Sequence, residues 1–489
     1  MKKQQSLLNE SASANPSANP WADKTSANAA NTADNTSSAN TADNTSSANS
    51  STSTTPRKKR TKYFSQKDVK TLALSSLGGT LEYYDFIIFV FFAKYIGANF
   101  FPTGIGEFWQ QMNAYGAFAA GYIARPLGGV VMAHFGDKFG RKSMFMLSIV
   151  LMVIPTAAIA ILPGYESIGF FAPLLLLLAR LVQGIAIGGE LPGAWVFIRE
   201  HSPEAKKGAY LGILTSAVAS GILLGSIVAL FMHKIYDEAA MLEWAWRLPF
   251  ALGAVFGVIS IYLRRYLSET PTFIQMKSEQ SLAKFPLSEV FRENKFAMII
   301  SGLMGWVMTV CVVGTILLMP NFAAEITGFN KVTSQYIHMC ALVMLSMGCA
   351  TSGSLCDNFG TSNVCWFFAA FYTIFGMGYF LSLYHFHDFT LILAFYMPLA
   401  FFTGGITTLT PVVMCELFRP QILFSGISFS YNIAYAISGF VTPLIITSLH
   451  FLSKNNFGKG IWLEMINPYY FLTIPAFLII TALAVRKQM

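Results

Sequence analysis

The chain has 489 residues, of which 54% are hydrophobic and only 12% are charged. Soluble domains carry about a quarter charged residues, so this composition excludes an ordinary soluble protein and predicts an all-α membrane protein. The net charge of +8 does not indicate nucleic-acid binding, because the basic residues gather where a membrane topology requires them. The six cysteines lack CxxC spacing, and we expect neither a metal site nor a cofactor.

Residues 1–62 differ in composition from the rest of the chain. They are rich in Asn, Ser, Ala and Thr, and TADNTSSAN occurs in tandem at 32–40 and 41–49. Such a segment cannot bury enough apolar surface to become ordered, so we predict a disordered cytoplasmic tail. No apolar stretch follows Lys2 and Lys3, and we therefore expect no cleaved signal peptide.

Twelve apolar runs follow the tail, each long enough to cross a bilayer as a helix. We place them at 71–101, 111–135, 143–163, 169–199, 206–234, 246–268, 295–324, 332–355, 363–384, 389–416, 422–450 and 465–485. Both termini and the even-to-odd connections then share one side, which carries 25 of the 33 Lys and Arg. The positive-inside rule makes that side cytoplasmic, and we expect a multi-pass protein of the cell inner (plasma) membrane.

The two halves of the chain repeat weakly. HFGDKFGRK at 134–142 joins spans two and three, and SLCDNFGTS at 354–362 joins spans eight and nine. A parallel repeat of six helices is typical of secondary transporters. We predict three parts after the tail: an N-terminal six-helix bundle at 63–268, a cytoplasmic interdomain loop at 269–294 and a C-terminal six-helix bundle at 295–489.

Five ionisable residues lie at membrane depth in the first half: Glu82, Asp85, Arg125, Arg180 and Glu190. Each costs about 2.5–3.5 kcal/mol on insertion scales, so such residues usually face the bundle interior and pair. Three acids against two arginines leave one acid without a basic partner, and a buried unpaired acid can be neutral and carry a proton. Asp85 is the first candidate and Glu82 the second, with Glu190 in the same set; alternatively, these residues only hold helices together.

Arg125 is the candidate for substrate binding. A guanidinium in a water-filled cavity makes bidentate contacts with a carboxylate, which could belong to Glu82, to Asp85 or to a substrate. Competition between substrate and acid for one arginine would couple binding to protonation. We find no Asp, Glu, Lys or Arg deep in the spans of the second half. Further polar candidates for the cavity are Tyr83, Tyr84, Tyr115, Tyr431 and Asn432. An interfacial or packed position explains the first three tyrosines as well, and helix packing explains the small residues that flank Tyr431 and Asn432.

The loop motif GDKFGRK at 136–142 has a physical interpretation. Gly136 and Gly140 permit a tight turn between two helix ends. Asp137 can accept hydrogen bonds from backbone amides or from Arg141. We expect Arg141 and Lys142 to anchor at the cytoplasmic headgroups.

Together with this loop, several motifs make the sequence resemble the metabolite:proton symporter family of the major facilitator superfamily, which includes proline/betaine, α-ketoglutarate, shikimate and citrate carriers. The resemblance covers about 71–485. It implies a major facilitator fold, with two six-helix bundles that rock around a central cavity, and proton-driven uptake of small organic acids or zwitterions. The motifs are EYYDF at 82–86, ARPLGG at 124–129, GDKFGRK at 136–142, RLVQGIAIGGE at 180–190, WAWRLPFALG at 244–253 and SYNIAYAISGFVTP at 430–443.

The resemblance also implies roles for individual residues. Arg180 matches a fourth-span arginine linked to proton coupling, and Arg247 is expected at the outer end of span six. The cytoplasmic gate would comprise Gly136, Asp137, Gly140, Arg141, Lys142 and Asp357.

This chain departs from the family pattern at several positions. Tyr83 stands where the family usually has Trp. The second loop motif has lost its basic residues, and the segment after span ten is also altered, which predicts a weaker gate in the second half. The chain ends three residues after Arg486, without a coiled-coil tail, so we expect no osmosensing by such a tail. The residues that carry the two gate changes are Thr361, Ser362, Asn363, Arg419 and Leu423.

The leading hypothesis is a proton-coupled symporter that imports a small carboxylate-bearing metabolite or a zwitterionic osmolyte. A metabolite exchanger and a non-transporting membrane sensor are the alternatives. No nucleophile–base set or phosphate loop lies at membrane depth, so we expect no enzyme and no catalytic residue. The expected partners are the substrate, protons and the lipid bilayer, without nucleic acid, and we expect a monomer.

Deletion of residues 2–55 should leave transport nearly intact, because the tail is predicted to have no packed structure. Uptake by whole cells, normalised to the amount of protein in the membrane, measures this. Complete loss of uptake at normal protein levels would show that the tail is not a passive segment.

Overall fold

The computed structural model describes residues 66–283, 285–319, 323, 326–328, 331–386, 388–455 and 468–488. The predicted tail at 1–62 lies outside these residues. Helices make up all of the regular secondary structure in the part of the chain that the structure describes.

The first six crossings end before Arg265. The first is broken, because α1 and α2 meet at Phe92 with a bend of 64°, so the prediction of one helix over 71–101 is wrong in detail. The crossings are α1 (Gln66–Phe91) with α2 (Ala93–Phe100), α3 (Glu107–Phe139), α4 (Arg141–Ile161), α6 (Phe171–His201), α7 (Lys207–Ile235) and α9 (Arg247–Arg264). Short turns connect them: η1 (Thr103–Ile105), α5 (Tyr165–Ile168), η2 (Glu204–Lys206), α8 (Glu238–Ala240) and η3 (Met241–Ala245).

Two short helices, α10 (Pro271–Ser278) and α11 (Pro286–Glu293), lead to the second six crossings. These are α12 (Lys295–Thr309) with η4 (Val310–Leu318), α14 (Lys331–Phe359), α15 (Thr361–Leu381) with η5 (Ser382–Phe386), α16 (Phe389–Leu417), α17 (Leu423–Asn455), and α20 (Thr473–Gln488) after the short α19 (Pro468–Phe471). In the described residues, ten helices are long and apolar enough to cross a membrane, and the bent pair α1–α2 is an eleventh.

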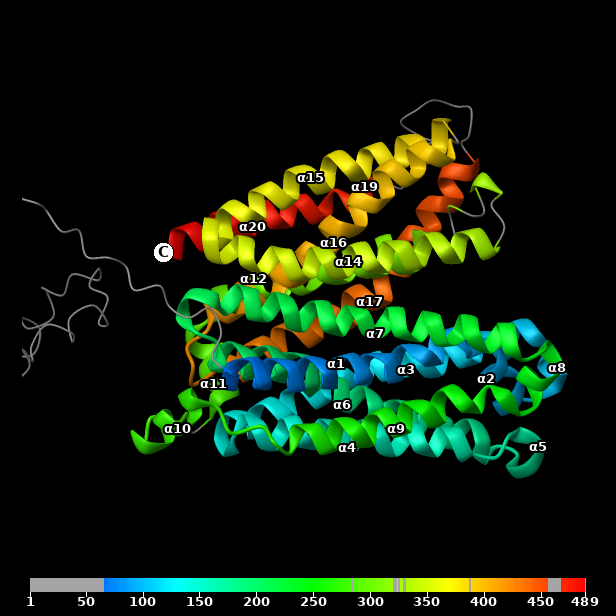
Figure 1. Cartoon of the computed structure of the whole chain (residues 1–489), viewed down its shortest axis with the longest axis horizontal. Coiled ribbons are helices and arrows are strands. Elements are labelled where there is room, and N and C mark those ends of the chain that lie inside the picture. The colour runs from blue at the N-terminus through cyan, green and yellow to red at the C-terminus, as the bar shows by residue number, and fades with distance from the viewer. Residues whose placement is uncertain are drawn as a thin grey trace, which may run out of the picture. The chain divides into compact units, whose positions relative to one another are not determined.

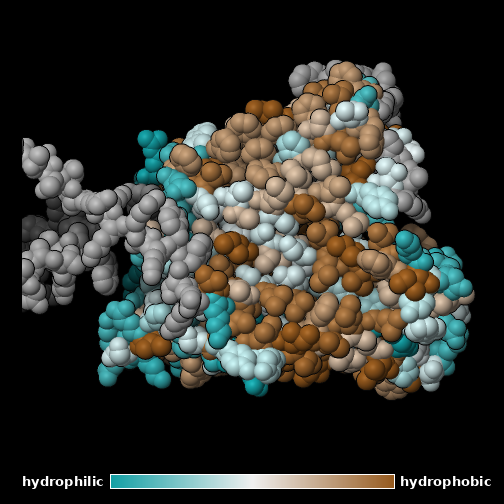
Figure 2. All heavy atoms as spheres, viewed as in Figure 1, coloured by the Kyte–Doolittle hydropathy of each residue, from teal (hydrophilic) through white to brown (hydrophobic). Residues whose placement is uncertain are grey.

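α3 is the twelfth crossing, and its 33 residues exceed what a bilayer requires. Arg125 and Asp137 lower its apolar character. The twelve-helix fold class is therefore confirmed, whereas the exact domain boundaries stay a prediction. Apolar side chains cover the middle of the face in Figure 2, and hydrophilic ones gather toward its two ends, as expected for a protein surrounded by lipid.

Glycines let α3 and α6 approach backbone to backbone. A Cβ atom at Gly128 would lie 2.0 Å from the carbonyl oxygen of Ile185, and one at Gly184 would lie 2.1 Å from that of Gly121. A Cβ at Gly188 would lie 2.1 Å from the carbonyl oxygen of Arg125. Small residues at a membrane helix interface allow such close packing, which here holds Arg125 directly beside α6.

The two halves meet along α7 with α14 and along α3 with α17, and Figure 1 shows α7 lying beside α14. A Cβ at Gly353 would lie 1.9 Å from the carbonyl oxygen of Gly208, and the Ser216 hydroxyl donates to the Ser346 carbonyl at 2.8 Å. These contacts belong to the part of each helix nearer α10 and α11, which we call the α10–α11 end. The halves are thus packed together at that end.

Replacement of Gly128 by Val should force α3 and α6 apart, because its Cβ has no space beside Ile185. Overpacking of this kind costs roughly 1–3 kcal/mol or more, so the melting temperature in detergent should fall clearly. Gly116→Val on the same helix is the matched control, since a Cβ there meets nothing within 4 Å. Equal melting temperatures for the two variants would contradict the close helix approach.

Candidate functional site

Asp85 ends a chain of buried hydrogen bonds inside the first half. Its Oδ2 accepts a hydrogen bond from the Thr156 hydroxyl of α4. The Gln183 amide donates to that hydroxyl oxygen at 2.7 Å, and the Arg180 guanidinium donates to Gln183 Oε1 at 2.6 Å. Arg180 on α6 is therefore linked to Asp85 on α1 through two neutral side chains. The sequence motifs contained Asp85, Arg180 and Gln183 but gave Gln183 no role, and Thr156 lies outside them.

Asp85 is buried, and among the described residues it forms no ion pair within 4.0 Å. Its Oδ1 has no hydrogen-bond partner in that part of the chain. Gly253 of α9 covers this oxygen, because a Cβ there would lie 2.8 Å from it. The carboxyl group of Asp85 is thus buried, and one of its oxygens has no hydrogen-bond partner among the described residues.

Arg180 is enclosed by aromatic rings as well as by its amide partner. Its guanidinium carbon lies 4.2 Å from the centre of the Phe89 ring and 5.0 Å from those of Phe86 and Phe118. Cation–π attraction of this kind is worth roughly 2 kcal/mol or more when the cation is desolvated. The rings offset part of the cost of burying this charge.

Glu82 and Glu190 share a third arginine, Arg264, which the charge count placed among the basic residues of the cytoplasmic side. Nη2 of Arg264 lies 2.8 Å from Glu82 Oε1 and 2.6 Å from Glu190 Oε1. Arg264 is fully buried, so the expectation of only two arginines among the three buried acids is wrong. Arg264 is the last residue of α9, and only the packing of α9 against α1 and α4 shows that it points inward.

Arg125 lies between the halves among tyrosines. Its guanidinium carbon is 4.1 Å from the ring centre of Tyr435, 5.6 Å from that of Tyr431 and 5.7 Å from that of Tyr122. Nη2 donates to the Tyr431 hydroxyl at 3.3 Å, while Nε has no hydrogen-bond partner among the described residues. Neither Glu82 nor Asp85 pairs with it, so two of the three partners that the sequence left open for Arg125 are excluded in this structure.

A cavity of about 30 Å³ lies next to these tyrosines, with walls from both halves. Tyr83, Trp195 and Tyr435 supply its aromatic wall, and Thr215 and Thr407 its hydroxyl groups. The Trp195 ring meets the Tyr431 ring edge-on at 4.9 Å. This volume holds about one or two water molecules, so a metabolite would fit only after the walls separate.

Three predicted cavity residues lie elsewhere. Tyr84 packs inside the first half, where its hydroxyl donates to the Pro249 carbonyl at 2.9 Å. Tyr115 is 39% exposed, and its hydroxyl accepts from Gln111. Asn432 donates to the carbonyl oxygens of Gly188 and Ser428 at 2.7 and 2.8 Å. Asn432 therefore joins the two halves, and the structure does not bring Tyr84 or Tyr115 to the cavity.

Asp137 and Arg141 join the halves at the α10–α11 end. Asp137 Oδ2 accepts from the Ser425 amide at the start of α17 at 2.9 Å, and Asp137 Oδ1 pairs with Arg141 at 3.1 Å. Arg141 also donates to the Pro420 carbonyl at 2.9 Å and lies 3.4 Å from Glu200. Because Arg141 is buried, the expectation that it anchors at lipid headgroups is wrong; its charge serves the contact between the halves.

Gly140 forms the turn between α3 and α4, whereas Gly136 lies within α3, where its missing side chain makes room for the other half. A Cβ at Gly136 would lie 2.5 Å from the Phe424 ring, and Gly140 has φ +119°, a conformation that favours glycine. Glu269 fills the space beside Gly140 and accepts hydrogen bonds from the backbone amides of Arg141 and Lys142. The Lys142 side chain reaches the Arg265 carbonyl at 3.4 Å.

Asp357 makes the corresponding contact from the second half. Its two carboxylate oxygens accept from the amides of Gly208 and Ala209, each at 2.8 Å, at the start of α7. A carboxylate at a helix N-terminus is favoured by the free amides and the helix dipole. Thr361, which replaces a basic residue of the family motif, donates to Glu416 at 2.8 Å. The second loop motif therefore still joins the halves without its lost charges.

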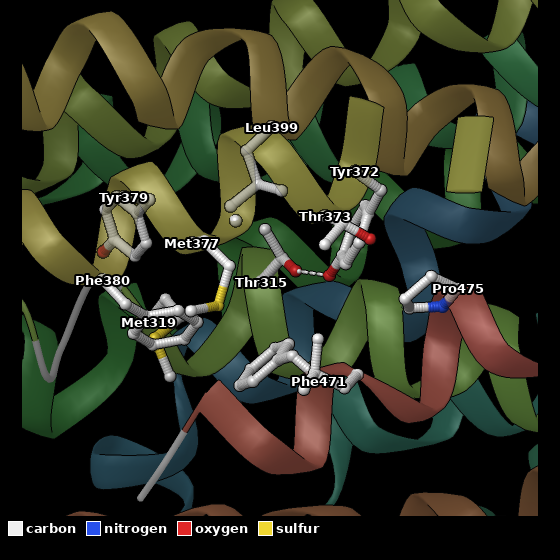
Figure 3. A pocket seen from close by; sticks show the side chains of 12 residues that line it. Thr315, Met319, Tyr372, Thr373, Met377, Tyr379, Phe380, Leu399, Phe471 and Pro475 are labelled. Atoms are coloured by element: carbon white, nitrogen blue, oxygen red, sulfur yellow. Dashed lines mark hydrogen bonds between the residues drawn. The ribbon is translucent and has the colours of Figure 1, made fainter. Parts of the chain in front are cut away.

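A further cavity, of about 20 Å³, lies wholly within the second half and is drawn in Figure 3. The Thr315 and Tyr372 hydroxyls share a hydrogen bond of 2.8 Å beside it. Met319, Phe380 and Leu399 make its walls largely apolar. Neither cavity has Asp, Glu, Lys, Arg or His in its lining, but Tyr435 in the wall of the first cavity lies against the Arg125 guanidinium, so the cavity of the second half is the weaker site candidate.

Comparisons with known proteins agree with this architecture. A family model described as "Sugar (and other) transporter" matches residues 71–297. A "Putative proline/betaine transporter" of Staphylococcus aureus (strain MSSA476) is 30% identical over 431 residues, which cover 86% of this chain and 89% of that protein. The "Alpha-ketoglutarate permease" of Escherichia coli (strain K12) is 30% identical over 401 residues, covering 81% and 90% respectively.

Solved structures share the fold. The proton:xylose symporter XylE superposes with a TM-score of 0.71 at 15% identity, covering 86% of this chain and 95% of that chain. FucP in its outward conformation gives a TM-score of 0.64 at 14% identity, covering 85% and 99%. With relatives at 30% identity along most of its length, the chain belongs to the metabolite:proton symporter family of the major facilitator superfamily and is a multi-pass membrane transporter, not an enzyme.

Proposed function

We propose that this transporter imports a small carboxylate-bearing metabolite or a zwitterionic osmolyte together with protons, by alternating access across the cell inner membrane. Both termini would lie in the cytoplasm. The observation that carries the proposal is Arg125, a guanidinium buried between the halves without a carboxylate partner in the described residues.

Burial of a charge without a counter-charge is costly, and the tyrosine rings offset only part of that cost. A substrate carboxylate would supply the missing partner, because a guanidinium holds it through two parallel hydrogen bonds. The Tyr431 hydroxyl, 3.3 Å from Nη2, occupies one such position in this structure. Substrate binding would then replace a bond between the halves with a bond to the substrate.

The aromatic wall of the cavity suits the other end of a zwitterion. Tyr83, Trp195 and Tyr435 present rings to the cavity, and such rings attract quaternary ammonium groups. The relatives' names include both zwitterion and dicarboxylate carriers. A single arginine beside the cavity supports a substrate with one carboxylate at this position.

Asp85 is the proposed proton carrier. A nearby cation favours the ionised form of a carboxyl group, and Asp85 forms no ion pair among the described residues. The chain through Thr156 and Gln183 to Arg180 would pass a change of charge at Asp85 on to α4 and α6. α6 packs against α16 and α17 of the second half, and Arg141 at the start of α4 reaches the Pro420 carbonyl.

Alternating access is supported by the closed α10–α11 end. Asp137, Arg141 and Asp357 hold the halves together there, and the cavity beside Arg125 is too small for a metabolite. Import would therefore require these contacts to break after the substrate enters from the opposite side.

Asp85→Asn should abolish accumulation driven by an imposed pH gradient while leaving substrate exchange, because the amide cannot carry the proton. Uptake and counterflow by proteoliposomes measure the two activities. Glu166→Gln, at an exposed residue of α5, is the control and should behave as wild type. Normal accumulation by the Asn variant would reject Asp85 as the carrier.

Arg125→Lys should raise the Kd for the substrate about 10-fold to 100-fold, because one ammonium cannot reproduce the two hydrogen bonds of the guanidinium. A thermal-shift screen of mono-, di- and tricarboxylates and betaines identifies a ligand, and titration of the variant with it gives the affinity. Arg265→Lys, at an exposed arginine, is the control. Unchanged affinity in Arg125→Lys would remove Arg125 from the substrate site.

A further inference from the structure

The triad of Glu82, Glu190 and Arg264 is separate from the hydrogen-bond chain of Asp85. Its members come from α1, α6 and α9, and their side chains are 7%, 12% and 0% exposed. Both glutamate Oε1 atoms contact the same nitrogen, Nη2, at 2.8 and 2.6 Å. The two Oε1 atoms can therefore lie no further apart than the sum of these two distances.

The groups around the triad are neutral. The Ser260 hydroxyl donates to Glu82 Oε1 at 3.4 Å, and the Ser148 hydroxyl donates to Glu190 Oε2. Arg264 Nη1 donates to the Phe145 carbonyl of α4 at 3.0 Å. With both glutamates ionised, the triad would hold one negative charge in excess, and neither serine nor the carbonyl offsets it.

Two carboxylates that share one cation in a medium of low dielectric constant repel each other, and one proton turns this repulsion into attraction. Glu82 Oε2 is buried and has no hydrogen-bond partner in the described residues, which leaves a position for that proton. We propose that Glu82 and Glu190 hold one shared proton on Arg264, and that this pair is a second proton-binding site of the transporter, separate from Asp85.

The role of this site in transport rests on the proposed function. Three acids and three arginines of the first half are buried at membrane depth in the part of the chain that the structure describes, and they balance when all six are ionised. The shared proton would leave one positive charge in excess, and a substrate carboxylate on Arg125 would offset it. Asp85 lies three residues from Glu82 on α1, so its charge also acts on the pair, and the test must separate the two.

Infrared difference spectra of the purified transporter across a pH titration test the site without any substrate. A protonated carboxyl group has its own C=O stretching band, and the shared proton should produce one in the wild type. Because the proton belongs to the pair, Glu82→Gln and Glu190→Gln should each remove the same band, whereas Asp85→Asn and Glu166→Gln should retain it. Persistence of every carboxyl band in both glutamine variants would overturn the proposal.

Ser148→Ala provides a second test that keeps all three charges. Loss of the donor to Glu190 disfavours the ionised pair, so the band should persist to a higher pH than in the wild type; an unchanged midpoint would also overturn the proposal. Failure of the wild type to accumulate substrate under a pH gradient would reject the proposed symport alone, because the band is measured in the absence of transport.

Discussion

The burial of Arg125, Arg180 and Arg264 at membrane depth within one six-helix bundle is the constraint on which the rest of the structure depends. A guanidinium cannot lose its charge in a protein, so each one requires partners at membrane depth. Arg264 has two glutamates, Arg180 has an amide and three aromatic rings, and Arg125 has tyrosines. These partners draw α1, α4, α6 and α9 together and leave Arg125 facing the other half of the molecule.

The three arginines differ in the charge of the groups around them. Arg264 is surrounded by an excess of negative charge, and Arg125 has no carboxylate partner in the described residues. Electrostatic attraction in a medium of low dielectric constant is strong. Arg125 would therefore bind an anion, and the glutamate pair would bind a proton. The physical basis for coupling would then be charge balance across the bundle, without direct contact between substrate and proton.

The contacts between the halves rely on backbone groups as much as on side chains. Asp137 and Asp357 each accept amide hydrogen bonds at the start of a helix in the opposite half. Because such bonds use groups that every helix N-terminus offers, the contact tolerates the loss of basic residues at Thr361. Glycines such as Gly208 and Gly353 bring the two backbones close enough for this arrangement.

The sequence by itself determined the crossings, the family and the positions of five ionisable residues within the apolar spans, because length, hydropathy and motif spacing are local properties. It placed Asp85, Glu82 and Arg125 within these spans but left their partners open. Only the tertiary structure decided that Glu82 meets Arg264, that Asp85 meets Thr156, and that Tyr84 and Asn432 lie away from the cavity. Helical periodicity shows which residues share a face, but the opposing residue comes from a helix distant in sequence, and that choice is made by packing.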